Sequence, residues 1–282
     1  MIRIGLAGWG DHDDLYPAGT PSGDKLRIYS HHFPIVEVDS SFYAVQPERN
    51  IRKWLRDTPD HFGFIFKVYQ GMTGHTRGRI PYASADAMFE DFKLSIGPVH
   101  QAGRLKAVLF QYPPWFDCTR QHVELLKRTK ARMGDLPVAL EFRHQSWFRP
   151  EYIDKTLMFM EQEGWIHSIC DEPQAGEGSV PTIERATSRV RTIVRFHGRN
   201  EEGWNRQGSG EEWRAVRYLY RYSEAELAEW KERLLRLQQS SEEICVIFNN
   251  NSGGHAAGNA KDLQRLLGQE PRPLPPRQME LL

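Results

Sequence analysis

The chain has 282 residues, of which 39% are hydrophobic, so it can form one large domain or two small ones. Its 37 basic residues balance its 37 acidic ones, so no net charge attracts a nucleic acid, an anionic membrane or an acidic partner. Three widely spaced cysteines without a CxxC pattern argue against a disulfide framework or a zinc knuckle. No run approaches the roughly 20 apolar residues of a membrane span, and the first residues do not form a signal peptide. We therefore expect a cytoplasmic protein with no membrane partner.

Short apolar runs recur along the chain, and most are followed by a helical pattern. We predict strands over residues 1–8, 35–39, 62–68, 105–111, from 138 onward, 165–170, 190–197 and 244–248. We predict helices over residues 24–33, 47–57, 85–96, 119–132, 150–163, 223–239 and 256–268. Ser223 and Glu226 form a capping-box pattern at the start of one of these helices.

The order of these elements predicts an α/β fold, a single (β/α)8 TIM barrel, although an open parallel sheet remains an alternative. Seven of the eight strands precede a plausible helix. The barrel should be irregular around its sixth helix, because residues 172–187 resemble a loop. The barrel domain should cover residues 1–270, and residues 271–282 form a Pro-rich tail that is either disordered or an extended strap.

Polar residues gather at the predicted carboxyl ends of the strands. The stretch from Val138 to Phe148 begins as a buried strand, but Glu141, Arg143 and His144 follow in close succession. Charged residues are rarely buried unless they are paired or bind something. If the strand continues to His144, strand alternation places Glu141 and Arg143 on one face, where they can pair with each other or reach a common ligand. A structural ion pair that closes the strand is the alternative.

The other strands end in the same way, and active sites of (β/α)8 barrels lie at this end. The strand-end residues are Glu37, Asp39, Lys67, Gln111, Asp171, Arg195, His197 and Asn249. The opposite ends carry fewer polar residues, chiefly Arg3, Lys106 and Arg191. We therefore predict a functional site at the carboxyl-end rim of the barrel.

Several kinds of chemistry fit these residues. Glu37 and Glu141 could be an acid and a base, as in glycoside hydrolysis, unless nearby cations such as Lys67 simply neutralise them. Lys67 could form a Schiff base, although an ion-paired lysine is the simpler interpretation. A metal could be bound by histidines and acids, but these lack the compact HxH or HExxH spacing of a specific site: His144, His197, His255, Glu37, Glu141 and Asp171.

Anion binding is the alternative that we favour. Guanidinium groups and backbone amides of glycine-rich loops hold phosphate or another oxyanion. The cations available are Lys67, Arg143, Arg195 and Arg199. Aromatic residues that follow the strands either stack a sugar or a base or cap the barrel core: Trp9, Phe42, Tyr43, Trp115, Trp147 and Trp204. Cys170 should be an inert buried thiol.

The motifs GLAGWG, VEVDSSFY, FIFKV, LFQYPP, VALEFRHQSWF, VRFHGR and FNNNSGGHAAGNA resemble, in order and spacing, the YecE-like family of TIM-barrel proteins. The resemblance covers residues 2–267 and implies a complete barrel, in a family of unknown function without an established reaction. It also implies a fold similar to that of the endonuclease IV-like and sugar-isomerase-like metal barrels. Those barrels use more histidines at their strand ends than this chain offers.

The sequence thus predicts an enzyme or a ligand-binding barrel that acts on a small polar or anionic ligand, a phosphorylated one included. The predicted catalytic residues are Glu37, Lys67, Glu141, His144 and His197. The predicted ligand-binding residues are Gln111, Arg143, Trp147, Arg195, Gly198, Asn249, Asn250 and His255. We assign no metal ligand, and the cofactor and oligomeric state are unknown. For an enzyme, a hydrolase or an isomerase or lyase fits best.

Two alternatives are kept. One is a nucleic-acid-processing or metal-dependent hydrolase resembling the endonuclease IV-like barrels, which rests on fold analogy and is not favoured by the balanced charge. The other is a binding protein without catalysis.

Overall fold

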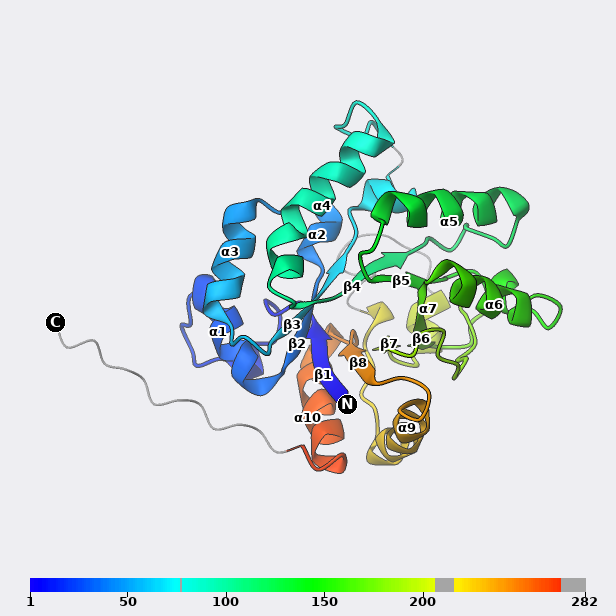
Figure 1. The fold of residues 1–282 in the computed structure, drawn as a ribbon. Coiled ribbons are helices and arrows are strands. Elements are labelled where there is room, and N and C mark those ends of the chain that lie inside the picture. The colour runs from blue at the N-terminus through cyan, green and yellow to red at the C-terminus, as the bar shows by residue number, and fades with distance from the viewer. Residues whose placement is uncertain (77, 206–215, 270–282) are drawn as a thin grey trace.

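The molecule is built around a barrel of parallel strands (Figure 1). The computed structural model describes residues 1–269, except residue 77 and residues 206–215. Eight strands pair in sequence order, and β1 closes the barrel by pairing with both β2 and β8. The strands are β1 Ile2–Ala7, β2 Ile35–Val38, β3 Gly63–Lys67, β4 Leu105–Gln111, β5 Val138–Glu141, β6 Ile166–Asp171, β7 Arg191–Phe196 and β8 Glu243–Phe248. The predicted TIM barrel is confirmed.

Helices surround the strands (Figure 1). The α-helices are α1 Ser22–His32, α2 Ser40–Tyr43, α3 Glu48–Asp57, α4 Ala85–Gln101, α5 Arg120–Met133, α6 Ile153–Glu163, α7 Glu201–Asn205, α9 Glu224–Leu237 and α10 His255–Leu266. Short 3-10 helices are η1 Asp13–Leu15, η2 Gln70–Thr73, η3 Gln145–Phe148 and η4 Ser252–Gly254. The capping box predicted at Ser223 and Glu226 is present. Within the described residues, no helix is long and apolar enough to cross a membrane.

Helix α4 is longer than predicted. It passes residue 96, where the prediction ended it, and continues through Pro98 to Gln101. Proline in a helix interior removes one backbone hydrogen bond, which by itself disfavours a helix that passes through Pro98. The helix continues because Val99, one turn after Ile96 on the same apolar face, is fully buried in the core. Tertiary packing here outweighs local propensity.

The sixth unit is irregular, as predicted. Residues 172–190, all of them described, form no helix. Side chains fasten this loop to the barrel instead: a Glu172 carboxylate oxygen accepts a hydrogen bond from the Val180 amide at 2.7 Å. The Thr187 hydroxyl donates to the Trp165 carbonyl at 2.7 Å and accepts from the His167 amide at 2.9 Å. The predicted tail, residues 271–282, lies outside the described residues.

An apolar layer fills the inside of the barrel. It consists of Ala7, Ile35, Ile65, Ala107, Leu109, Ala139, Ile166, Ile193, Cys245 and Ile247. The alternate residues of the strands point outward and pack under the helices, so the strands are apolar on both faces. Because side chains alternate along a strand, the inward face continues two residues beyond this layer. The inward residues at that next level are Glu37, Lys67, Gln111, Glu141, Ser168, Arg195 and Asn249.

An ion network closes the amino end of the barrel. Glu243 of β8 contacts Arg3 Nε at 2.6 Å, Arg191 Nη2 at 2.6 Å and Lys106 Nζ at 3.4 Å. These three cations are the polar residues that the sequence placed at the opposite ends of the strands. They form ion pairs at the amino end of the barrel, where such contacts contribute to stability. The apolar layer separates them from the carboxyl-end rim.

Gly5 is required where β1 and β2 approach each other. A Cβ atom at Gly5 would lie 2.0 Å from the Ile35 carbonyl oxygen, so Gly5→Ala must push the two strands apart. We expect a loss of at least about 2 kcal/mol in the free energy of unfolding, measured by urea denaturation. The control is Gly258→Ala on the exposed side of α10, where a Cβ meets nothing within 4 Å and should stabilise slightly. Equal stability of the two variants would contradict this account.

Candidate functional site

Ionisable side chains are buried together at the carboxyl end of the barrel. We call this set the ionic cluster: Glu37, Glu141, Arg143, Glu172, Arg195 and His197, each exposed by 4% or less. Its members come from β2, from β5 and the segment after it, from the residue after β6, and from β7 and the residue after it. Ion burial on this scale costs free energy unless the charges pair closely, so the pairing of each group decides what the cluster can do.

Arg195 lies at the centre of the ionic cluster. Its Nε and Nη2 atoms donate to the two carboxylate oxygens of Glu37, at 2.9 and 2.6 Å. Its Nη1 atom donates to both oxygens of Glu141, at 3.0 and 2.8 Å. One guanidinium therefore holds two buried carboxyl groups, and a single positive charge offsets two negative ones.

Glu141 is the better stabilised of these two carboxylates. Besides Arg195 it accepts hydrogen bonds from Gln111 Nε2 at 2.5 Å and from the Ser168 hydroxyl at 3.0 Å. Burial by itself raises the pKa of Glu141, but Arg195, His197 and Arg143 outweigh burial and hold that pKa well below its usual range. Glu141 is therefore an ionised carboxylate.

Glu37 is in the opposite situation. Among the residues that the structure describes, Arg195 alone donates hydrogen bonds to it. Burial, which Arg195 offsets only in part, raises the pKa of Glu37 to about 8, and the nearby Asp39 carboxyl adds to the rise. The two carboxyls on Arg195 thus have opposite proton affinities.

Arg143 and Glu172 form the second ion pair of the ionic cluster. Arg143 Nη1 lies 2.8 Å from Glu172 Oε2 and 3.4 Å from Glu141 Oε1. Its guanidinium also stacks over the Trp204 ring, with 4.7 Å from Cζ to the ring centroid. Burial raises the pKa of Glu172 to about 7, although Arg143 opposes this rise. Arg143 therefore stands between two acids and an aromatic ring, at the side of the cluster.

His197 is a neutral imidazole. Burial, together with Arg143 and Arg195, lowers the pKa of His197 to about 3. Its Nδ1 atom lies 3.0 Å from Asn249 Nδ2, and its Nε2 atom lies 3.4 Å from Glu141 Oε1. If the Asn249 amide donates to Nδ1, the ring proton is on Nε2 and points at Glu141. Asn249 would then set the tautomer through which His197 supports Glu141.

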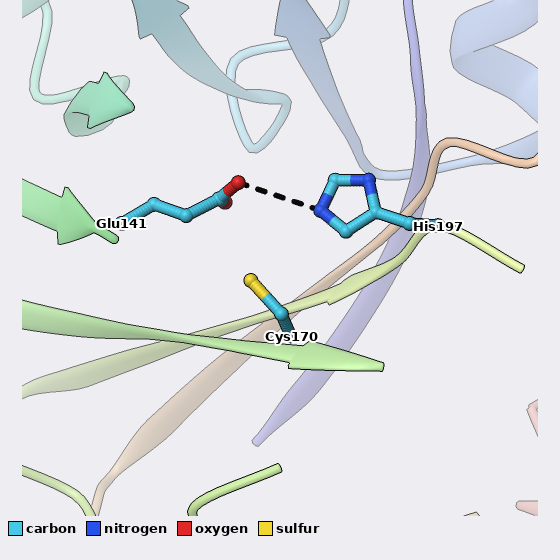
Figure 2. A group of neighbouring side chains, drawn as sticks. All are labelled: Glu141, Cys170 and His197. Atoms are coloured by element: carbon cyan, nitrogen blue, oxygen red, sulfur yellow. Dashed lines mark ion pairs between the residues drawn. The ribbon is translucent and has the colours of Figure 1, made fainter. Parts of the chain in front are cut away.

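Glu141, Cys170 and His197 converge on one point (Figure 2), with one ligand atom of each within 4.8 Å of the others. Carboxylate, thiolate and imidazole are the groups that bind zinc, so the donor set fits that metal by type. Two features oppose a cation there. Burial raises the pKa of the Cys170 thiol, and Arg195 Nη1 lies 2.8 Å from Glu141 and 3.5 Å from His197. A metal ion would have to displace the guanidinium, which already supplies positive charge at this point.

Half-buried side chains lie at and just after the carboxyl ends of the strands, next to the ionic cluster. We call them the mouth: Phe42, Lys67, His75, Gln111 and Asn249. Lys67 Nζ lies 4.5 Å from the centroid of the Phe42 ring. His75 Nδ1 pairs with the Thr73 hydroxyl at 2.8 Å. Burial, then Lys67 and Arg143, lowers the pKa of His75 to about 4, so this imidazole is neutral as well.

Two predicted residues that follow β5 lie away from the ionic cluster. The His144 ring accepts the Ser146 amide at 3.2 Å and caps the short helix η3. Trp147 is buried in the layer outside the barrel, stacked on Phe142 with 4.1 Å between ring centroids, and its indole donates to the Phe116 carbonyl at 2.7 Å. Both residues have structural contacts, and neither enters the site that we propose.

Three further predicted residues support loops at the rim. Gly198 has a φ of +84°, and a Cβ there would meet the Tyr220 side chain at 2.6 Å, so the close approach requires glycine. Asn250 donates to the Tyr220 carbonyl at 2.8 Å and to Asn259 Oδ1 at 3.0 Å. His255 is the first residue of α10. These positions shape the rim without joining the ionic cluster.

The sequence did not single out Ser168, Glu172 or His75. Ser168 had a signal, because strand alternation places it on the inward face that Cys170 shares. Glu172 directly follows a strand end and could have been included with Asp171. Asp171 instead faces outward, where it pairs with Arg199 at 2.6 Å and accepts a hydrogen bond from Trp230. His75 lies in a loop, where no periodic pattern indicates direction.

These features define a class: a TIM-barrel protein with a buried ionic cluster at the carboxyl ends of its strands. The chain belongs to the family described as "Protein of unknown function DUF72", which matches residues 3–280. The family resemblance drawn from the motifs is therefore confirmed.

Relatives and solved structures agree with this assignment. The chain is 57% identical over 281 residues to UPF0759 protein YunF of Bacillus subtilis (strain 168), covering 100% of both chains. It is 24% identical over 223 residues to UPF0759 protein YecE of Escherichia coli (strain K12), covering 73% of this chain and 78% of YecE. The crystal structure of a DUF72 family protein from Enterococcus faecalis V583 matches with a TM-score of 0.89 and 35% identity, covering 98% of this chain and 100% of that one. A DUF72 family protein from Thermotoga maritima MSB8 matches with a TM-score of 0.80 and 31% identity, covering 95% and 99%.

Glu37→Gln should change how stability depends on pH. Because the pKa of Glu37 is about 8 in the folded protein and near 4.5 ordinarily, the folded state holds the proton more tightly. The wild-type free energy of unfolding should then fall as pH rises from 4.5 to 8, by up to about 1.4 kcal/mol per pH unit from this group. Glu37→Gln should lose that component, as measured by urea denaturation at pH 5 to 8.

The matched control is Glu48→Gln, an exposed carboxylate on α3 whose side chain is 57% accessible. Its profile should run parallel to that of the wild type. Parallel profiles for Glu37→Gln and wild type would show that Glu37 is ionised throughout this pH range.

Proposed function

We propose that the carboxyl-end rim binds a small polar or anionic ligand and that Glu37, with Asp39, transfers a proton to or from it. The observation that carries this proposal is the sharing of Arg195 by two buried carboxyls with opposite proton affinities. Pairs of titratable groups whose environments push their pKa values apart are typical of acid–base sites. A group with a pKa near 8 can both donate and accept a proton close to neutral pH.

The ligand should enter through the mouth. Lys67, Gln111 and Asn249 are half-buried there, and the fully buried Glu37 points inward at the same level of the strands. Lys67 offers a positive charge beside the Phe42 ring, and Arg143 contributes a second charge from the side of the ionic cluster. Both cations lower the pKa of the His75 imidazole, so the positive charge of each reaches the mouth.

We propose a role for Arg195 other than the ligand binding that the sequence predicted. Its Nε, Nη1 and Nη2 atoms all donate hydrogen bonds to Glu37 or Glu141, so its guanidinium is engaged in holding these two carboxyls. We accordingly assign anion binding to Lys67 and Arg143, and positioning of the acid–base group to Arg195. Glu141 then serves as the fixed counter-charge, supported by His197.

Proton transfer of this kind suits a hydrolase or an isomerase or lyase. A barrel that binds its ligand without turnover would need no buried carboxyl group with a raised pKa beside Arg195, so Glu37 favours an enzyme. The balanced charge of the chain, 37 basic and 37 acidic residues, provides no general attraction for nucleic acid. Nucleic-acid processing is therefore the weaker alternative.

Binding of inorganic phosphate should test both parts of the proposal by isothermal titration calorimetry. At pH 8, a bound anion beside Glu37 disfavours its ionisation, so phosphate binding should be accompanied by proton uptake, measured in buffers of different ionisation enthalpy. Lys67→Met should weaken binding by about tenfold, which corresponds to ~1.4 kcal/mol. Glu37→Gln should keep binding but lose the proton uptake.

The control is Lys93→Met, which removes a lysine that pairs with Glu90 on the outer surface of α4. It should bind phosphate like the wild type. Binding that is equally strong in Lys67→Met, or proton uptake that persists in Glu37→Gln, would contradict the corresponding part of the proposal.

Metal-dependent chemistry is the second candidate, favoured by the convergence of Glu141, Cys170 and His197. Because Arg195 already supplies charge there, we expect the purified protein to contain far less than one zinc ion per chain by mass spectrometry. Cys170→Ser should not change that content, and Cys118→Ser, at a half-buried cysteine outside this group, is the control. One zinc per chain, lost only in Cys170→Ser, would establish the metal site and displace the proposal above.

A further inference from the structure

We infer that the ligand of the mouth is an acidic sugar, a sugar ring bearing a phosphate or carboxylate group, with the ring against an aromatic wall and the acidic group beside Lys67 and Arg143. This inference rests on the proposed function and names the substrate class for that site. It depends on three observations: a row of rings, a pair of cations beside it, and a floor of hydrogen-bonding groups.

The aromatic wall consists of Tyr43, Phe42, His75 and Trp115. Phe42 contacts Tyr43 with 5.4 Å between ring centroids and His75 with 5.1 Å, and His75 contacts Trp115 at 6.0 Å. Tyr43 and Trp115 are 55% and 53% exposed, which is unusual for such large rings. Exposed aromatic faces that adjoin a polar site commonly pack against the flat apolar face of a ligand ring. The row comes from the segments after β2, β3 and β4, so it borders one side of the mouth.

The cations lie beside this wall. Lys67 Nζ is 4.5 Å from the centroid of Phe42, the second ring of the row. Lys67 and Arg143 both lower the pKa of His75, the third ring, so the positive charge of each also reaches this part of the wall. His75 itself is neutral and adds an aromatic face without adding charge. A ligand that covers the wall therefore meets positive charge at its edge, which favours an acidic substituent.

The floor favours a sugar over a flat aromatic base. The half-buried Asp39 accepts hydrogen bonds, and the half-buried amides of Gln111 and Asn249 both donate and accept them. Sugar hydroxyls also both donate and accept, and they project around the ring in several directions. A nucleobase presents its polar groups only along its edges, in the plane of the ring. A polar floor of mixed character beneath an aromatic wall therefore matches a sugar better.

Affinities of five probes, measured by isothermal titration calorimetry, test this inference: glucose 6-phosphate, glucuronate, glucose, inorganic phosphate and adenosine monophosphate. At least one of the two acidic sugars should bind about tenfold more tightly than glucose and about tenfold more tightly than phosphate. Which of the two binds better identifies the acidic group. In Trp115→Ala, the acidic sugar should bind no more tightly than phosphate, because stacking on one aromatic side chain accounts for about a tenfold difference in affinity. In Lys67→Met, the acidic sugar should bind no more tightly than glucose.

The control for Trp115→Ala is Leu94→Ala, which truncates a 73% exposed apolar residue on α4. Because both positions are at the surface, both variants should fold, and Leu94→Ala should bind like the wild type. Phosphate binding as tight as that of both acidic sugars would overturn the sugar assignment and leave the proposed function standing. If adenosine monophosphate bound more tightly than both acidic sugars, the aromatic wall would be assigned to a nucleobase instead. Failure of every acidic probe to bind would overturn both proposals.

Discussion

One guanidinium placed between two buried carboxyls is the interaction on which the rest of the site depends. Arg195 reaches Glu37 and Glu141 at 2.6 to 3.0 Å and is itself 1% exposed. Its single charge cannot neutralise both acids. Glu141 is stabilised by additional donors, so the shortage of positive charge falls on Glu37, which keeps a proton. The acid–base character of the site follows from that shortage.

Such a cluster is difficult to explain as a device for stability. Buried ion pairs often contribute no more to folding than apolar residues of similar volume would, because desolvation offsets their attraction. The barrel has an apolar layer directly below, and its amino end has a conventional network in which Glu243 meets three partly exposed cations. The ionic cluster is more deeply buried than that network. Burial of charge without evident benefit to stability is typical of functional sites.

The Val138–Phe148 stretch shows how far local pattern reaches. Alternation correctly placed Glu141 and Arg143 on one face, and both lie in the ionic cluster. Strand β5 ends at Glu141, so alternation does not apply to His144, whose ring caps η3. Trp147 follows in a 3-10 helix, for which strand periodicity predicts nothing, and packs in the outer layer. Position after a strand end therefore did not by itself decide which side chains join the ionic cluster. Arg143, Glu172 and His197 follow strand ends and belong to it, whereas His144 and Trp147 do not.

The sequence by itself determined the eight strands, the irregular sixth unit and the level at which inward side chains change from apolar to polar, because these follow from periodicity along a single segment. Only the tertiary structure decided which charges meet. Arg195 and Glu37 are 158 positions apart, and their contact exists because the sheet closes into a barrel. Proton affinity likewise depends on burial and on neighbours from other strands. Hence the sequence could name Glu37 and Glu141 together, and only the fold could show that they have opposite roles.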